Sequence, residues 1–115
     1  VLGASTNPER MSHKAVRLLK VRGYHPIPVH PSGHSVADIP GVKSLDDLQS
    51  PPDTLTMYVN AGISNEETDR ILKLHPRRVI FNPGAETPEL AGKLRDAGIE
   101  VVEECTLVML RQGEF

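Results

Sequence analysis

The sequence has no tryptophan and only four aromatic side chains, two tyrosines and two phenylalanines, among 115 residues. The core must therefore be built from aliphatic side chains, which suits helices packed against a parallel sheet. Single-stranded nucleic acid stacks on a series of aromatic platforms, and this chain has too few to provide one. The formal net charge of -2 also argues against a general nucleic-acid binder.

Cysteine and long hydrophobic runs are scarce as well. Cys105 is the one cysteine, so the chain can form no internal disulfide and no multi-cysteine zinc site, and the histidines fall on separate segments. With no apolar run of membrane-spanning length and no visible secretory signal, we expect a cytoplasmic protein without metal or membrane contact. Because Val1 lies inside an apolar run with no initiator methionine before it, we expect the natural chain to extend upstream.

Charge is distributed unevenly along the chain. Residues 1–43 contain six Lys or Arg against two Asp or Glu, whereas the remaining residues contain seven against thirteen. We therefore expect an anionic ligand to bind near the N-terminal third. The length suits one compact domain over residues 1–115, and no repeat or linker divides it.

Apolar runs alternate with helical patterns, which is typical of βαβ units with helices on both faces of a parallel sheet. Ser64 with Glu67 predicts a capping box at one helix start, and Thr87 predicts a cap ahead of Pro88. Right-handed crossovers then give a doubly wound sheet of five parallel strands in the order 3-2-1-4-5. The strands are expected at 1–4, 25–29, 55–59, 79–81 and 99–103, and the helices at 12–21, 44–48, 64–74, 88–97 and 106–112.

Ligands of such sheets bind beyond the carboxyl ends of the strands. At the first of these ends an apolar strand runs into Gly3 and then into a basic helix, where backbone N–H groups and the helix dipole favour a phosphate. Arg10 offers a planar guanidinium to the same anion. Ser5 could donate to phosphate or merely satisfy the turn, and His13 could hold phosphate or only pack.

An ordinary NAD site is not predicted. Such a site needs G-x-G-x-x-G after the first strand and a carboxylate at the end of the second. This chain has one glycine in the turn, and its second strand ends in Val29-His30-Pro31.

Several short motifs, spread over nearly the whole chain, occur together. They are Leu2-Gly3-Ala4-Ser5 with Asn7-Pro8 and Arg10, Gly23-Tyr24, Ile27-Pro28-Val29-His30-Pro31, Asn82-Pro83-Gly84-Ala85 and Glu104-Cys105. In this combination the chain resembles the small stand-alone CoA-binding domain proteins, which are similar to the CoA-binding domain of succinyl-CoA synthetase. The resemblance implies a Rossmann-like fold that binds coenzyme A or an acyl-CoA. It also implies that the pyrophosphate lies over the turn at residues 3–5 and the adenosine end against residues 29–31.

The expected cofactor-binding residues lie in three loops: Gly3, Ala4, Ser5, Asn7, Arg10, His30, Pro31, His34, Asn82, Pro83 and Gly84. Two positions depart from the family pattern. Family members often have lysine after the second-strand proline, where this chain has Ser32, and His30 or His34 could replace that charge. Asn82 stands where glutamine is common.

No nucleophile, base and orienting group fall together in a way that specifies a reaction. The sequence therefore predicts a ligand-binding module with no catalytic residues, whose partner is a small nucleotide and which leaves room for a protein partner. Two alternatives stay open: a subunit of an acyl-CoA-handling enzyme, and a degenerate Rossmann scaffold for protein contacts. Cys105 could approach the CoA thiol, although a lone cysteine at a strand end is more often a packing residue.

Overall fold

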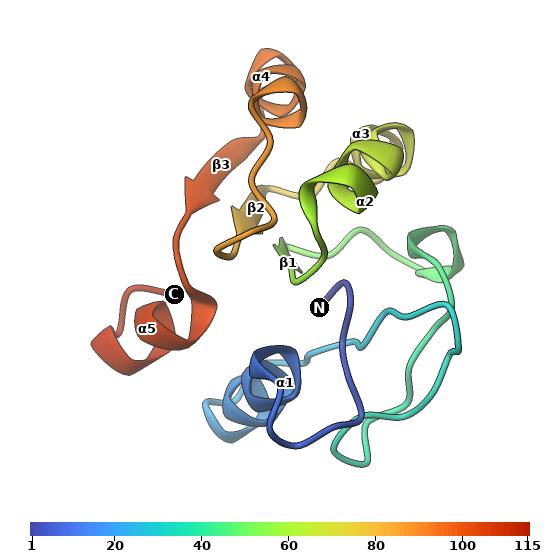
Figure 1. Cartoon of the computed structure of the whole chain (residues 1–115), viewed down its shortest axis with the longest axis vertical. Helices are drawn as coiled ribbons and strands as arrows, with labels where there is room; N and C mark the ends of the chain where they lie inside the picture. The colour runs from blue at the N-terminus through green and yellow to red at the C-terminus, as the bar shows by residue number, and fades with distance from the viewer.

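The strands of the central sheet are all parallel. The computed structural model describes residues 1–115 and contains β1 (Thr54–Met57), β2 (Arg78–Phe81) and β3 (Glu100–Glu103), in the order β1-β2-β3 (Figure 1). Val79 of β2 pairs with Leu55 on one side and with Val101 on the other. All four residues of β2 are buried, as expected for an apolar strand that is covered on both faces.

Beyond β1 the sheet continues through single residue pairs. Leu2 bridges in parallel to Met57 and to Val29, and Val29 bridges in parallel to Val42. The predicted strands at 1–4 and 25–29 are therefore neighbours, but each is reduced to one bridging residue. The full order is the segment at Val42, then Val29, Leu2, β1, β2 and β3.

The predicted strand order is wrong in one respect. Leu2 lies between Val29 and Met57. The strand predicted at 55–59 therefore pairs with the strand at 1–4 and not with the strand at 25–29. The outer position belongs to the segment at Val42, for which no strand is predicted because it lies in a loop rich in Pro, Gly and Ser. With that segment counted as a strand, the order is 3-2-1-4-5-6, the arrangement of dinucleotide-binding sheets.

Helices cover both faces of the sheet, as predicted (Figure 1). One apolar cluster, which includes Val16 and Leu110, lies under α1 and α5, and a larger one, which includes Ile71 and Leu90, lies under α3 and α4. None of the helices combines the length and apolarity that crossing a bilayer requires. The helices are α1 (Met11–Val21), α2 (Ala61–Glu66), α3 (Thr68–Leu74), α4 (Pro88–Asp96) and α5 (Thr106–Gln112), with a 3-10 turn, η1, at Leu45–Asp47.

Two predicted caps are wrong in detail. Ser64 lies inside α2 and is buried, and its hydroxyl donates to the carbonyl of Ala85 at 2.9 Å. Asn60 is the residue that caps α2, since its side chain accepts a hydrogen bond from the first turn at 2.9 Å. Thr87 does precede α4, but its hydroxyl donates to the Asn65 side chain at 2.9 Å instead of capping the helix. Both hydroxyls therefore tie α2 to the segment that follows β2.

Candidate functional site

Three loops meet at the carboxyl edge of the sheet, and together they contain all the predicted site residues. They are residues 3–10 after Leu2, residues 30–34 after Val29 and residues 82–86 after β2. The first two are joined by the His34 ring, whose Nε2 lies 3.1 Å from the carbonyl oxygen of Ala4. The third begins beside the end of β1, and the first packs against the residues that follow β1.

Gly3 is required by the close packing of the first loop. Its φ is +85°, and a Cβ at this position would lie 2.6 Å from the Tyr58 carbonyl oxygen and 2.9 Å from Cγ1 of Val59. Its N–H donates to the carbonyl of Val29 at 2.8 Å. A side chain here would push the loop away from the sheet.

Short polar side chains hold the rest of the first loop. The Ser5 hydroxyl oxygen accepts from the Asn7 N–H at 3.1 Å, and the Asn7 side-chain oxygen accepts from the Glu9 N–H at 3.0 Å. The Ser5 N–H donates to the hydroxyl of Ser12 at 3.0 Å. Ser5 therefore satisfies the turn through its oxygen, while its hydroxyl hydrogen has no acceptor in the protein.

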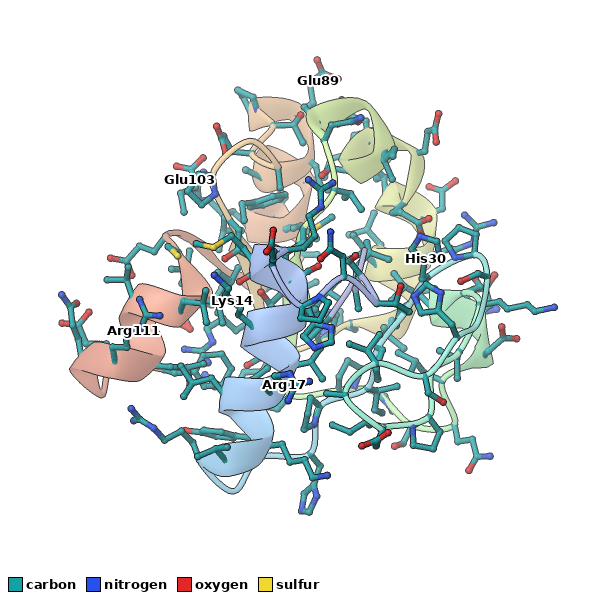
Figure 2. The ribbon with its side chains drawn as sticks, turned by 60° about the horizontal axis from the view of Figure 1, so that its bottom comes forward. Lys14, Arg17, His30, Glu89, Glu103 and Arg111 are labelled. Carbon is teal, nitrogen blue, oxygen red and sulfur yellow. The ribbon has the colours of Figure 1, made fainter.

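His13 supports the loop from beneath. Its Nδ1 lies 2.9 Å from the Ser5 carbonyl oxygen, and its Nε2 lies 2.8 Å from the Arg17 Nε. Because arginine can only donate, Nε2 must accept, and Nδ1 therefore carries the proton that is donated to the carbonyl. His13 is buried and both of its nitrogens are used, which favours the packing role. Figure 2 shows Arg17 and Lys14 on α1, with His30 on a neighbouring loop.

The start of α1 leaves backbone donors without a partner in the protein. Arg10 is the N-cap residue but makes no side-chain cap, and the first turn contains no acidic residue. The N–H groups of Met11, Ser12 and His13 have no hydrogen-bond partner in the protein. Arg10 is exposed and takes part in no ion pair. Unpaired backbone donors and the positive end of the helix dipole therefore lie directly after Arg10, whose guanidinium is unpaired.

The second loop holds two stacked imidazoles. The rings of His30 and His34 are 4.6 Å apart between centroids and inclined by 28°. The Ser32 hydroxyl lies between their Nδ1 atoms, 2.9 Å from that of His30. With His34 Nε2 at the Ala4 carbonyl, His30 Nε2 is the one ring nitrogen of the pair without a protein partner.

Asn82 is 2% exposed and its amide is fully used inside the protein. Its Nδ2 donates to Thr56 Oγ1 at 2.8 Å and to the Met57 carbonyl at 2.9 Å, and its Oδ1 accepts from the Thr106 N–H at 2.8 Å. The side chain therefore links β1, the end of β2 and the start of α5. Of the three predicted residues in this loop, Pro83 and Gly84 are the exposed ones.

Tyr58 was not identified from the sequence. It follows β1, and burial raises its pKa from 10.0 to about 12. Its hydroxyl is buried and makes no hydrogen bond in the protein, while the nearby Thr106 hydroxyl is bonded to Thr56 at 2.7 Å and opposes part of the rise in the Tyr58 pKa. The half-buried Cys105 lies next to Thr106, at the start of α5. No local sequence pattern signals an unpartnered hydroxyl at this position.

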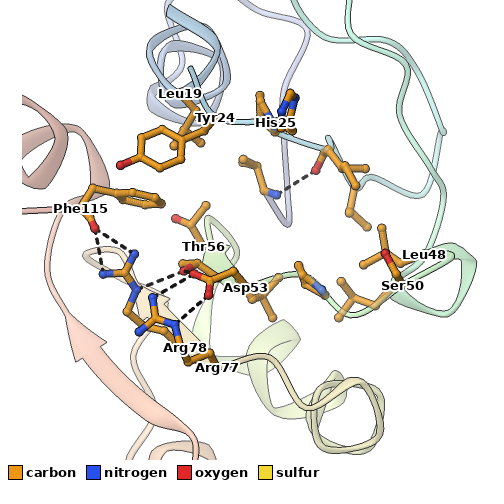
Figure 3. Close-up of a pocket in the computed structure, with 18 residues that line it drawn as sticks. Leu19, Tyr24, His25, Leu48, Ser50, Asp53, Thr56, Arg77, Arg78 and Phe115 are labelled. Carbon is orange, nitrogen blue, oxygen red and sulfur yellow. Dashed lines mark hydrogen bonds and ion pairs between the residues drawn. The ribbon is translucent and has the colours of Figure 1, made fainter. Parts of the chain in front are cut away.

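A cavity of about 420 Å³ lies at the opposite edge, where the strands begin (Figure 3). Both of its arginines are already hydrogen-bonded within the protein: Arg77 binds both carboxylate oxygens of Asp53, at 2.7 and 2.9 Å. Arg78 donates to Thr54 Oγ1 at 3.2 Å and to the carbonyl oxygen of Phe115 at 3.3 Å. None of the predicted site residues lines this cavity. The carboxyl-edge loops, which offer unpaired donors, are therefore the better candidate.

The geometry first defines a class of protein. A parallel sheet with a tight glycine turn and an uncapped, basic helix start at its carboxyl edge is typical of α/β domains that bind phosphate-bearing ligands. The family model for the CoA binding domain matches residues 1–111. The chain therefore belongs to the CoA-binding domain family.

Solved structures agree with this assignment. A crystal structure of an uncharacterized protein is 39% identical, with a TM-score of 0.90, and the match covers 99% of this chain and 93% of that one. A Thermus thermophilus protein is 32% identical, with a TM-score of 0.90 and coverage of 99% and 87%.

The fold also occurs within a larger enzyme. The apo form of a dinucleotide forming acetyl-coenzyme A synthetase 1 from Ca. Korarchaeum cryptofilum is 16% identical, with a TM-score of 0.76. The match covers 90% of this chain but 25% of the synthetase chain, so the domain corresponds to about a quarter of that protein. This likeness shows the fold alone.

Proposed function

We propose that the protein binds coenzyme A, or an acyl-CoA, at the carboxyl edge of its sheet. Membership of the CoA-binding domain family supports the ligand class. The observation that carries the proposal is the uncapped start of α1, where three N–H groups without partners lie beside the unpaired Arg10. These donors match the charge and the oxygen atoms of a pyrophosphate.

Each loop has a distinct part in the proposed complex. The pyrophosphate lies over the turn at residues 3–5, where it accepts hydrogen bonds from the first turn of α1, from Arg10 and from the Ser5 hydroxyl. The adenosine end lies against residues 29–31, and Pro83 and Gly84 form the third side of the site. Asn82 acts as a positioning residue for that third loop, because its amide is committed to the protein interior.

The chain's own residues suggest binding without chemistry. A second candidate function is that of a subunit in acyl-CoA transformation, which family membership leaves open because a CoA-binding domain can supply the ligand site of a larger enzyme. The two differ in one observable: a binding module leaves acetyl-CoA unchanged on prolonged incubation, whereas an enzyme subunit turns it over once its partner chain is added.

Calorimetric titration tests the binding proposal. Purified protein is titrated with CoA, dephospho-CoA, NAD and ATP at one salt concentration. We expect CoA to bind with micromolar affinity, about -8 kcal/mol, and NAD and ATP to bind more weakly. Arg10→Ala should weaken CoA and dephospho-CoA by a similar factor, on the order of tenfold, because it removes a charge-assisted contact to the pyrophosphate that both share.

Arg111→Ala is the matched control, since Arg111 is exposed on α5, near its C-terminal end. It should leave all four affinities unchanged. An absence of heat and of any thermal shift with every ligand would refute the proposal and favour the scaffold alternative. Equal losses in the two arginine variants would show that Arg10 contributes only long-range charge.

A further inference from the structure

Lys43 lies across the turn of the second loop. A Cβ placed on Gly33 would be 2.8 Å from Cγ of Lys43, 3.7 Å from its Cδ and 3.3 Å from its Cε. The side-chain carbons of Lys43 therefore pack against Gly33, on the side where another residue would carry its Cβ. The ammonium group is one bond beyond Cε and so lies near this turn. Gly33 also has a φ of +67°, so both its conformation and the lysine above it require glycine.

The outer strand segment explains why Lys43 reaches this loop from ten positions further along the chain. Val42 N–H donates to the carbonyl of Pro28 at 3.0 Å, and the His30 N–H donates to the carbonyl of Val42 at 3.0 Å. This parallel pairing of Val29 with Val42 places Lys43 alongside the second loop. Backbone hydrogen bonds thus bring the residue 43 backbone within reach of the second loop.

The ammonium group is available to a ligand. Lys43 is exposed and takes part in none of the ion pairs, which involve Arg70 and Arg77 as the cations. The nearby His34 uses both of its ring nitrogens within the protein, and His30 has one left. A lysine presents a point charge with three donors, which suits a phosphate, whereas His30 offers a single free ring nitrogen. Lys43 is therefore the strongest cation that the second loop presents.

We infer that Lys43 reads the 3'-phosphate of coenzyme A and so sets the preference for CoA over dephospho-CoA. The inference rests on the proposed function, which places the adenosine end of CoA against this loop. The 3'-phosphate is borne by the ribose of that end and is the one group that distinguishes the two ligands. Lys43 supplies from the outer strand segment the cation that Ser32 does not supply after Pro31.

Titration of three forms of the protein with CoA and with dephospho-CoA tests this assignment. The wild type should prefer CoA by about tenfold, which corresponds to about 1.4 kcal/mol. Lys43→Gln should lose most of that preference through weaker CoA binding, with its dephospho-CoA affinity within about twofold of the wild type. Lys20→Gln removes the same charge from the exposed end of α1 and should keep the wild-type preference.

The outcomes separate this inference from the proposed function. If the wild type binds neither ligand, the proposed function fails and the inference fails with it. If the wild type binds both ligands equally, or if Lys43→Gln keeps the preference, CoA binding stands and the role of Lys43 is refuted. Equal weakening of both ligands by Lys43→Gln also refutes it, because the lysine would then act on a part of the ligand that both share. Thermal melting of Lys43→Gln checks that the exposed substitution leaves the fold intact.

Discussion

Replacing Asn82 with alanine should be one of the most destabilising single changes in the three loops of the site. The amide makes three hydrogen bonds in a place where the residue is 2% exposed. Two of its partners keep another bond, since Thr56 Oγ1 remains bonded to Thr106 and the Met57 carbonyl still accepts the backbone N–H of residue 82. The third partner, the Thr106 N–H at the start of α5, loses its only acceptor and stays buried.

The magnitude follows from these partners. A lost bond whose partner stays satisfied costs about 1 kcal/mol, and a buried N–H left without an acceptor costs about 1–3 kcal/mol. The expected loss for Asn82→Ala is therefore about 3–5 kcal/mol of unfolding free energy. Urea denaturation followed by circular dichroism measures it directly, from the shift in midpoint at constant slope.

Asn60→Ala is the control for the chemistry of the substitution. Asn60 is exposed and makes one capping bond to α2, so its loss should cost about 1 kcal/mol. If Asn82→Ala costs no more than Asn60→Ala, the buried linkage is not a stabilising one and the reasoning fails. Below the melting temperature of the variant, CoA affinity should fall less for Asn82→Ala than for Arg10→Ala, because the Asn82 amide faces inward.

Two further predictions follow from groups with shifted pKa values. Tyr58→Phe removes a buried hydroxyl without a partner, so the variant should be as stable as the wild type or up to about 1 kcal/mol more stable in urea at neutral pH. Because burial raises the pKa of Tyr58 from 10.0 to about 12, the wild type should lose stability relative to this variant as the pH rises through that interval; parallel curves would contradict it. Asp53→Asn should lower the urea midpoint slightly at neutral pH, since the bidentate hydrogen bonds from Arg77 hold the pKa of the Asp53 carboxyl at about 2, below the ordinary 3.8. That difference in urea midpoint should vanish as the pH falls from 3.8 to about 2. Urea midpoints of both proteins at four or five pH values across this range measure it. A constant offset between them would show that the Asp53–Arg77 pair does not contribute.

The elements predicted best from the sequence were those with chemical signals at their ends. The last helix was expected at 106–112 and is found at Thr106–Gln112, and the helix at Pro88 begins at that proline. β2 and β3 each differ by one residue at their first position from the predicted strands. In each case a proline, a glycine or a dense apolar run limits the choice to one or two positions.

The predicted helix cap at Ser64 was wrong for a different reason: the side chain finds its hydrogen-bond partner in a distant segment of the chain. Ser64 and Glu67 have the spacing of a capping box, but the Ser64 hydroxyl finds a buried acceptor, Ala85, 21 positions away. The structure supplies an alternative bond that local spacing cannot reveal. Local spacing also cannot reveal the partners of Asn82, which lie on β1 and at the start of α5; its predicted part in ligand binding stays a prediction.

The strand order was predicted wrongly because the segment at Val42 pairs with the sheet only through Val29. A single pairing residue is too short a signal to predict a strand. Once the bridge between Val29 and Val42 exists, however, its effect on the proposed site is larger than its length suggests. It creates an edge on which Lys43 lies over Gly33, in the loop where a cation is expected but where the local sequence offers only histidines. A substitution that disrupts this pairing without touching Lys43 should therefore act on ligand preference and not only on stability. The segment at Val42 therefore does two things that the sequence did not predict. It completes the sheet, and it brings to the second loop the lysine charge that is absent after Pro31.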